Sequence, residues 1–460
     1  MELKDYATRR TNDSGRESWR PQRAIRFSPW IALLSVAVYG CESGEAPEAR
    51  SASLDSDLTS ETETQVFPPG LQVNGKCVGV RLPAPYSTPS ADKKAQVVGW
   101  PAGKTPTAAA GLRVTSYADG LAFPRWLYPL PNGDVLVSEG RSDWSGPGYS
   151  PDIVELLRDT DKDGFAETRV TFAEKLNLPF GMLLLGDWIY IANTDAIYRY
   201  HYTSGQTHVD APELVIALPS EGYHGHWTRN LLARPDGKKI FVTVGSATNV
   251  AEEGMAKEEH RANILEMNPD GSDLRVYASG LRNPVGVGFN PVGGKLWAAV
   301  NERDELGDDL VPDYTTSVRE GAFYGWPFAY IGQNEDPRRA GERPDLVKKT
   351  ICPDIVLGAH TASLGLHFYG GSMFPRRYRN GLFISQHGSW NRSTGSGYKV
   401  IYIPFKFGIP VGPPEDFVTG FLVDPSVPSA YGRPVGLTEL ADGSMLVADD
   451  DGRRVWRISN

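Results

Sequence analysis

Short runs of alternating apolar and polar residues, separated by turns that contain glycine, recur from about residue 111 to the end of the chain. Each unit begins near a Gly or Pro followed by two apolar residues, and a β-branched run follows the turn. A period of two indicates β-strands and excludes a helical solenoid. The pattern occurs six times, at residues 120–140, 178–200, 226–246, 280–304, 364–390 and 432–458.

The turn glycines of these units lie about 50 to 60 residues apart, with one longer gap before Gly381. Repeats of short strands at this spacing are typical of the blades of a β-propeller, where closure of the ring removes exposed sheet edges. We therefore predict an all-β, six-bladed β-propeller over residues 111–460. A β-sandwich with additional strands is the alternative.

The first part of the chain has a different composition. Residues 1–41 combine several arginines with a short apolar run that ends at Gly40 and Cys41, which resembles a bacterial lipoprotein cleavage site. We expect an exported protein on the periplasmic face, with Cys41 as its lipid anchor; a plain secretory signal or a buried strand is the alternative. The composition of residues 42–70 predicts a disordered acidic Ser/Thr linker. We expect residues 71–110 to form an extension that packs on the propeller.

Charge and cysteine content narrow the set of partners. The formal net charge of −9 argues against nucleic acid. No apolar stretch approaches the roughly 18 residues of a spanning helix, so we expect membrane contact through the N-terminal lipid only. Export permits a disulfide between Cys77 and Cys352, but the sequence leaves their pairing open. Without a C-x-x-C-H haem motif, electrons from a redox reaction would leave to an external acceptor, a soluble cytochrome or a quinone.

Cationic and titratable residues recur near the inner strands of the third, fourth and fifth repeats, where equivalent positions converge on the axis of a propeller. They are His226, then Arg282 and Asn283, then His387, Asn391, Arg392 and Lys399. Arginine forks match carboxylates, and a histidine can act as general base, so this set favours an anionic ligand on the axis. The alternative is structural, with each Arg capping loop carbonyls and each His packed in the core.

Two acidic segments are candidates for cation binding. The loop at residues 301–314 offers carboxylates and backbone carbonyls, the oxygen ligands that calcium prefers, although a solvated acidic loop is the alternative. The segment at residues 158–167 begins like an EF-hand loop, but Val170 stands where that loop requires Glu. We interpret the second segment mainly as a connection between strands, with a structural calcium ion as the alternative.

Several motifs together resemble one known family. The G-x-S-x-G nucleophile elbow of hydrolases, the P-loop and the dinucleotide-binding fingerprint do not occur between the strand and the helix that each of them requires. In contrast, the sequences HWTRNLLARPDG, SGLRNPVG, NERDELGDDLVPDY, YGWP and SQHGSWNR resemble the glucose/sorbosone dehydrogenases that depend on pyrroloquinoline quinone (PQQ), in particular the L-sorbosone dehydrogenase-like branch. The resemblance covers about residues 111–460.

This resemblance implies a six-bladed propeller that holds PQQ on its axis. It places His226 at the catalytic base, and Arg282 with Asn283 on the quinone side of the cofactor. Further cofactor or substrate contacts fall on Arg392, Lys399, Asn249, Trp326 and His387. Calcium would bridge the cofactor and the protein at the backbone carbonyls of Glu302 and Arg303, with Asp304 and Asp308 as additional ligands.

One position departs from the resemblance. Glucose-oxidising relatives carry an Asp that orients the histidine, whereas Ser246 stands here and can hydrogen-bond an imidazole without stabilising its charge; Asn249 is expected to share this role. We predict a quinoprotein dehydrogenase, dependent on PQQ and calcium, that oxidises an aldose, a sorbosone-like sugar or a related aldehyde by hydride transfer. A cofactor-free binding module and a calcium-dependent lactonase-type hydrolase are the alternatives.

Overall fold

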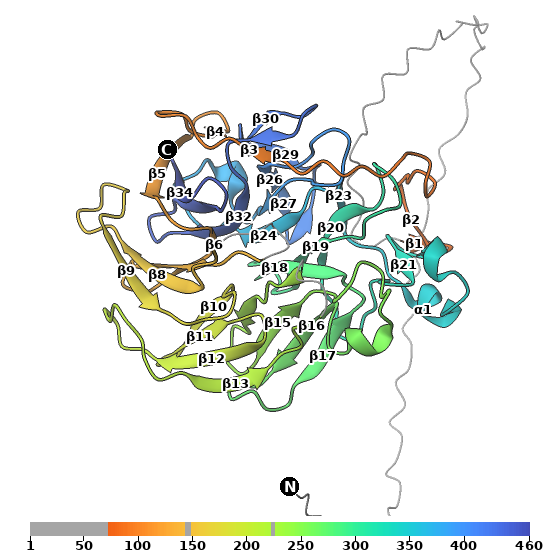
Figure 1. Cartoon of the computed structure of the whole chain (residues 1–460), viewed down its shortest axis with the longest axis horizontal. Helices are drawn as coiled ribbons and strands as arrows, with labels where there is room; N and C mark the ends of the chain where they lie inside the picture. The colour runs from red at the N-terminus through yellow and green to blue at the C-terminus, as the bar shows by residue number, and fades with distance from the viewer. Residues whose placement is uncertain (1–71, 143–148, 222–225) are drawn as a thin grey trace, which may run out of the picture. The chain divides into compact units, whose positions relative to one another are not determined.

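A computed structural model describes residues 72–142, 149–221 and 226–460 of the chain. The predicted leader, the lipidation residue Cys41 and the linker at residues 42–70 lie outside the described residues. Within the described ranges, six antiparallel sheets of four or five strands form the body of the protein (Figure 1). No helix in these ranges has the length and apolarity needed to cross a membrane.

The first three blades are each built from four strands that follow one another in the chain. Blade 1 contains β6 (Pro124–Pro129), β7 (Val135–Glu139), β8 (Ile153–Arg158) and β9 (Thr168–Ala173). Blade 2 contains β10 (Met182–Leu185), β11 (Trp188–Ala192), β12 (Ala196–His201) and β13 (Glu213–Ala217). Blade 3 contains β14 (Leu231–Ala233), β15 (Ile240–Val244), β16 (Asn263–Met267) and β17 (Arg275–Ser279).

The last three blades include insertions or strands from the N-terminal part of the chain. Blade 4 contains β18 (Asn283–Phe289), β19 (Leu296–Asn301), β20 (Pro312–Ser317) and β23 (Ile355–Ala359). Blade 5 contains β24 (Ser363–Phe368), β25 (Leu382–Gln386), β26 (Lys399–Ile403), β29 (Glu415–Thr419) and β4 (Thr107–Ala108). Blade 6 contains β32 (Pro434–Glu439), β33 (Met445–Asp449), β34 (Arg454–Ser459) and β5 (Arg113–Asp119).

The ring is closed by β5, which precedes blade 1 in sequence but pairs with β34, the last strand of the chain. Figure 1 shows this orange strand beside blue β34. The inner strands contact one another in the order β6, β10, β14, β18, β24, β32 and back to β6. The predicted all-β, six-bladed propeller is therefore confirmed, and each predicted repeat supplies the first two or three strands of a blade.

The apolar core lies between adjacent blades. Val135 of blade 1 and Leu446 of blade 6 belong to one buried cluster, and Ile197 of blade 2 and Val242 of blade 3 belong to another. Strands in the middle of a blade are covered on both faces, which explains why β7, β15 and β33 are buried along their whole length. The ends of the inner strands are left to form the central site.

The inner strands approach one another closely around the axis. A Cβ atom added to Gly286 of β18 would lie 2.6 Å from the carbonyl oxygen of Leu364 on β24, and one on Gly436 of β32 would lie 2.6 Å from that of Arg125 on β6. Only glycine permits this spacing. The register also shifts near the start of β6, β18, β24 and β32, and such bulges re-aim the side chains beside them.

The longer gap before Gly381 has a structural origin. Between β20 and β23 the chain inserts the hairpin β21 (Ala329–Tyr330) and β22 (Asn334–Glu335), followed by α1 (Pro344–Lys349). A smaller hairpin, β27 (Phe405–Lys406) and β28 (Ile409–Pro410), extends blade 5. Short 3-10 turns lie at Met255–Glu258, Pro337–Arg339 and Arg376–Tyr378.

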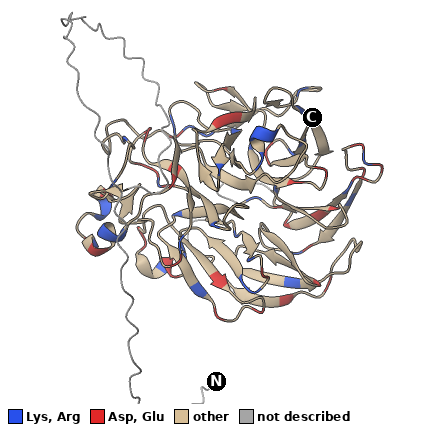
Figure 2. Cartoon of the chain, turned by 180° about the vertical axis from the view of Figure 1, so that it is seen from behind, with Lys and Arg blue, Asp and Glu red and all other residues tan. Residues whose placement is uncertain are grey.

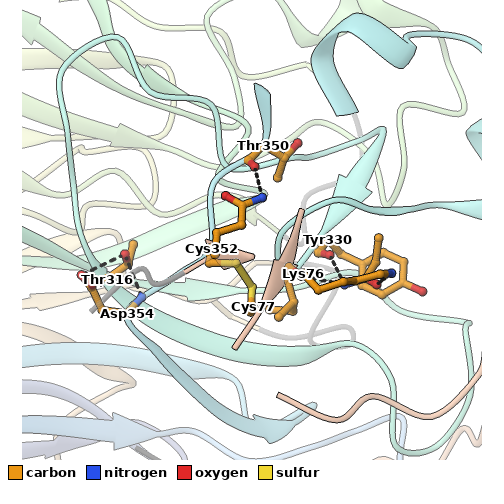
Figure 3. The surroundings of a disulfide bond; sticks show 10 residues. Lys76, Cys77, Thr316, Tyr330, Thr350, Cys352 and Asp354 are labelled. Atoms are coloured by element: carbon orange, nitrogen blue, oxygen red, sulfur yellow. Dashed lines mark hydrogen bonds between the residues drawn. A yellow bond between two sulfur atoms is a disulfide. The ribbon is translucent and has the colours of Figure 1, made fainter. Parts of the chain in front are cut away.

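Residues 72–106, which we call the strap, are attached to the propeller at several points. The strap begins with the hairpin β1 (Gln72–Val73) and β2 (Lys76–Cys77), and Cys77 forms a disulfide with Cys352 (Figure 3). Further along, β3 (Gln96–Val97) pairs in parallel with β31 (Ser429–Ala430), which also pairs with β30 (Leu422–Asp424). The pairing that the sequence left open is thus present, and it joins residues 275 positions apart.

Candidate functional site

Charged residues do not mark the site by themselves, because Lys and Arg are interspersed with Asp and Glu over the ribbon (Figure 2). A cavity that opens to solvent lies instead where blades 1, 3, 4, 5 and 6 converge. We call it the axial cavity. Its lining includes Trp227 and Trp390 and the polar residues Arg125, Ser142, His226, Arg282, Asn283, Asn301, Glu302, Asp304, Asp313, His360, His387, Asn391 and Arg433.

The base predicted from the sequence, His226, lines this cavity. Its Nδ1 lies 2.9 Å from the Oγ of Ser246 and 3.1 Å from the Ser246 carbonyl oxygen. The Ser246 hydroxyl donates a hydrogen bond to the carbonyl of Thr248, 2.6 Å away, so it can only accept from His226. Nδ1 of His226 therefore carries the proton, and Nε2 is the basic nitrogen. Burial, followed by the charge of Arg282, lowers the pKa of His226 well below its usual value, so the imidazole is neutral near pH 7.

The guanidinium of Arg282 organises the fourth blade's side of the cavity. It donates to Oδ2 of Asp304 at 2.8 Å, to Oδ1 of Asn249 at 2.8 Å and to the carbonyl oxygen of Glu302. Burial opposes ionisation of Asp304, but Arg282 and His360 outweigh it and hold the pKa of that carboxyl well below its usual range. The cavity therefore contains a buried, fully charged pair, Arg282 and Asp304.

Four lining residues carry a buried polar atom without a hydrogen-bond partner: Oγ1 of Thr228, Oδ1 of Asn283, Oε1 of Glu302 and Nε of Arg125. Buried polar atoms in folded proteins are nearly always paired, so unpaired ones beside a cavity indicate a place for a polar ligand. PQQ is a flat quinone with three carboxylates. Three arginines suit its carboxylates and two tryptophans suit its flat ring, whereas the unpaired oxygens of Asn283 and Glu302 suit hydrogen-bond donors and not carboxylates.

On the opposite side, His387 and Asp450 form a second buried pair. The Nε2 of His387 lies 3.0 and 2.9 Å from the two carboxylate oxygens of Asp450, and Arg125 donates to the same carboxylate. Burial and the neighbouring Arg433 lower the pKa of His387 to about 4. This histidine is therefore a neutral donor near pH 7, and it lines the cavity in which the sequence predicted it to contact the cofactor.

Several predicted cofactor residues do not line the axial cavity. Arg392 pairs with Asp309 at 2.5 Å, and Lys399 pairs with Asp416 at 2.6 Å between the two outer strands β26 and β29. Trp326 donates to the backbone oxygen of Asn249 at 2.8 Å and packs with Ala251 and Ala262. Asn249 itself bonds to Arg282 and to the backbone of Asp304, so it supports Arg282 and does not share the orienting role of Ser246.

The predicted calcium ligands have other partners in the structure. The Arg303 side chain is fully buried against Glu302 and Asp336, and Asp308 accepts from the backbone of Ser393. The carbonyl of Glu302 and the carboxylate of Asp304 are both bonded to Arg282, which would repel a cation there.

Two other groups of side chains in the described ranges could share a metal ion: His387, Asp450 and Asp451, and the acidic segment Asp159, Asp161, Asp163 and Glu167. The first already contains the bonds of Arg125 and His387 to Asp450. The second lies in the connection between β8 and β9, where Asp159 and Asp163 accept from backbone N–H groups of the same loop. The second group lies in the acidic segment for which the sequence kept a structural calcium ion as the alternative, and it contains none of the four ligands predicted for the cofactor calcium.

The sequence reading missed Arg125, Arg433, His360, Asp313 and Asp450. A signal existed for Arg433, because G-R-P-V-G in the last repeat parallels R-N-P-V-G in the fourth. Arg125 likewise stands at the start of the first repeat's inner strand. His360, Asp313 and Asp450 carry no comparable motif; only the fold brings His360 and Asp313 to the cavity and Asp450 to its partners Arg125 and His387.

The propeller fold of this chain is shared with solved structures of PQQ-dependent sugar dehydrogenases. The chain matches the TrAA12-like family over residues 106–319 and 343–460, and it belongs to that family. The sorbosone branch within it stays a prediction.

Two related proteins share low sequence identity with the chain. The chain is 31% identical over 299 residues to an uncharacterised protein from Borreliella burgdorferi, covering 63% of this chain and 77% of that protein. It is 26% identical over 152 residues to the aldose sugar dehydrogenase YliI of Escherichia coli, covering 33% of this chain and only 38% of that protein.

Solved structures show the same fold. The holo form of the pyranose dehydrogenase PQQ domain from Coprinopsis cinerea matches with a TM-score of 0.66 at 20% identity, covering 80% of this chain and 100% of that domain. The calcium structure of a Trichoderma reesei enzyme of carbohydrate-active family AA12 matches with a TM-score of 0.66 at 21% identity, covering 80% and 98%. At these identities the likeness establishes the fold alone.

Proposed function

We propose that this protein is a PQQ-dependent dehydrogenase that oxidises a sugar, or a related aldehyde, at the axial cavity. The observation that supports it most is the placement of a neutral, oriented His226 in the same cavity as three arginines. The names of the relatives YliI and the Coprinopsis pyranose dehydrogenase point in the same direction. A cofactor-free binding module would have no use for a base held in one tautomer.

The cavity residues divide into two roles toward the cofactor. Arg282 and Asn283 would contact its quinone side, as the family resemblance implies. Arg125 and Arg433, on the far side of the cavity, would pair with its carboxylates. When bound, PQQ supplies a quinone that accepts the hydride released from the substrate carbon.

In the reaction, the side chains of the protein accept a proton from the substrate and stabilise the negative charge that develops. Nε2 of His226 accepts the proton of the hydroxyl on the carbon being oxidised, while Ser246 holds the ring by Nδ1. The guanidinium of Arg282 stabilises negative charge that develops beside it, a role worth about 2.7–4 kcal/mol for a comparable donor. An aldose then yields a lactone, and a hydrated aldehyde yields an acid.

Calcium and the cellular setting are further parts of the proposal. A calcium ion at the Glu302 carbonyl would require Arg282 to leave it, so the effect of calcium on PQQ affinity is measured separately. We also propose export, lipid anchoring at Cys41 on the periplasmic face, and transfer of electrons to a soluble cytochrome or quinone.

The test is reconstitution of the apo protein with PQQ, with calcium or with a chelator, followed by absorbance and by dye reduction with a panel of aldoses and aldehydes. Saturable PQQ binding with turnover supports the proposal. Failure of PQQ to bind under both conditions would overturn it. Binding without turnover across the panel would favour the binding module, and hydrolysis of lactones without PQQ would favour the hydrolase.

A further inference from the structure

A groove lies between the neighbouring blades 1 and 2, outside the axial cavity (Figure 1). Its walls come from the connection between β9 and β10, from the turn between β11 and β12, from β12 itself and from the segment that leads to β13. The backbone N–H of Val209 donates to the carbonyl of Phe172 at 2.9 Å, which joins the two blades here. We call this space the outer groove, and its lining includes Asn177, Asn193, Asp195, Tyr198, Tyr200 and Val209.

A smaller space, which we call the chamber, connects the outer groove to the axial cavity. Asn177 lines both the outer groove and the chamber, and His226 and Trp227 line both the chamber and the axial cavity. Neighbouring spaces therefore share walls all the way from the outer groove to the proposed base. A substrate that reacts beside His226 can reach the outer groove only if it extends past the chamber.

Two acceptor atoms in the wall of the outer groove have no hydrogen-bond partner within the described ranges. They are Oδ1 of Asn193, a residue that is only 4% exposed, and Oδ1 of Asp195. Both residues belong to the turn between β11 and β12, and the backbone N–H of Leu218 fixes this turn by donating to the carbonyl of Asp195 at 2.7 Å. Because buried polar atoms are nearly always paired, these oxygens indicate a ligand that donates hydrogen bonds.

The outer groove does not call for a charged ligand. The buried guanidinium of Arg229 attracts the carboxylate of Asp195, but it donates to three backbone carbonyls and leaves Oδ1 of Asp195 without a hydrogen bond. The other charged side chains in the described lining pair with each other, Lys175 with Glu174 and His208 with Asp210. What the groove lacks is therefore a set of hydrogen-bond donors and not a counter-charge.

Two tyrosines of β12, Tyr198 and Tyr200, complete the wall. A tyrosine offers an apolar ring together with a hydroxyl that donates and accepts. Sugars carry hydroxyl donors around a ring with apolar faces, which suits both the tyrosines and the unpaired oxygens. A metal ion suits the groove less well, because calcium takes roughly six to eight oxygen ligands, and the two groups of described side chains that could share a metal lie elsewhere.

We propose that the outer groove binds the non-reducing part of an oligosaccharide whose terminal aldose reacts in the axial cavity. The substrate class is then an extended, neutral saccharide. Asn193 and Asp195 accept hydrogen bonds from its hydroxyl groups, while its reacting carbon lies near His226. This proposal rests on the proposed dehydrogenase function and names the substrate class for it.

The experiment measures binding as well as turnover. D-Glucose, cellotriose and maltotriose are titrated into the full chain by calorimetry, with and without PQQ, and dye reduction is followed with the PQQ-loaded protein. We expect at least one trisaccharide to bind about tenfold more tightly than D-glucose and to raise kcat/KM by a similar factor. Asn193→Ala and Asp195→Ala should each weaken binding of that trisaccharide about three- to tenfold, with D-glucose binding unchanged.

Asp187→Ala is the matched control, since it removes an exposed carboxylate from the turn between β10 and β11 of the same blade and lines none of the three spaces. Equal affinities for D-glucose and both trisaccharides, or equal losses in the Asp187 and Asp195 variants, would overturn the proposal. Saturable calcium binding that Asp195→Ala abolishes would also overturn it, because the groove would then be a cation site. A chain that binds a trisaccharide through Asn193 and Asp195 but does not bind PQQ would refute the dehydrogenase and leave the saccharide groove in place.

Discussion

The Oγ of Ser246 accepts a hydrogen bond from Nδ1 of His226 at 2.9 Å and donates a hydrogen bond of its own to the carbonyl oxygen of Thr248. This pair fixes the tautomer of the imidazole without supplying a charge. The neighbouring carboxylate, Asp304, is committed to Arg282 and Asn391. His226 therefore works as a base oriented by neutral groups, and its variants should separate orientation from proton transfer.

Replacement of the base and of its orienting partner should have unequal effects. His226→Gln removes proton acceptance and should lower kcat about 10²–10⁴-fold. Ser246→Ala leaves the Ser246 carbonyl, 3.1 Å from Nδ1, as an acceptor and should lower kcat only about two- to tenfold. Steady-state dye reduction measures both, with PQQ affinity as the control for folding. Equal losses in the two variants would show that His226 is not the base.

The pH profile of kcat/KM should reflect the low pKa of His226. Burial and Arg282 lower this pKa, so the imidazole stays neutral and able to accept a proton as pH falls from 8 through its ordinary value near 6.5. Activity should therefore hold through this window and decline only at lower pH. Rates measured with a dye whose own reduction does not depend on pH check this, and a decline centred at or above pH 6.5 would contradict the assignment.

The sequence predicted the blades because their information is local: a period of two, a glycine turn and a repeat every 50 to 60 residues or so define each blade. The same repeats placed His226, Arg282 and Asn283, which do meet in the cavity. Lys399 illustrates what local information lacks. It stands near other cationic residues in sequence, but it lies on the third strand of its blade, and strand pairing places it beside Asp416.

Long-range contacts were equally hidden from the sequence. The insertion at residues 320–354 and the path of the strap bring Cys77 to Cys352 and Lys94 to the rim of the site, and no motif encodes either path. Asp450 follows an ordinary apolar strand, and its partners Arg125 and His387 belong to two other blades. Such contacts depend on ring closure, which only the assembled fold defines.

Arg433 and Lys399 offer a direct comparison of the structural and sequence-based assignments for the cofactor carboxylates. Arg433→Gln should weaken PQQ binding about tenfold or more, because it removes a charged partner from the cavity wall. Lys399→Gln should leave PQQ affinity unchanged, because that side chain is paired with Asp416. Absorbance titration measures both affinities. A loss of PQQ affinity in the Lys399 variant but not in the Arg433 variant would show that Lys399, and not Arg433, binds the cofactor carboxylates.

The disulfide should stabilise the folded chain as a whole. Cys77 and Cys352 close a loop of 275 residues, so the bond restricts a large part of the unfolded chain, and its removal typically costs about 2–5 kcal/mol. We expect the double variant Cys77→Ser, Cys352→Ser to have a free energy of unfolding lower by this amount, as measured by urea denaturation.

The native fold of the same double variant should persist, because the strap has other anchors. Trp100 donates to Asp449 at 2.7 Å, β3 pairs with β31, and the backbone N–H of Tyr86 donates to the carbonyl of Leu306 at 2.7 Å. The far-UV circular dichroism of the double variant should therefore match that of the unaltered chain under native conditions. Chemical reduction of the unaltered chain is the control and should reproduce the loss of stability. An unchanged urea midpoint after both treatments would show that the noncovalent anchors alone set the position of the strap.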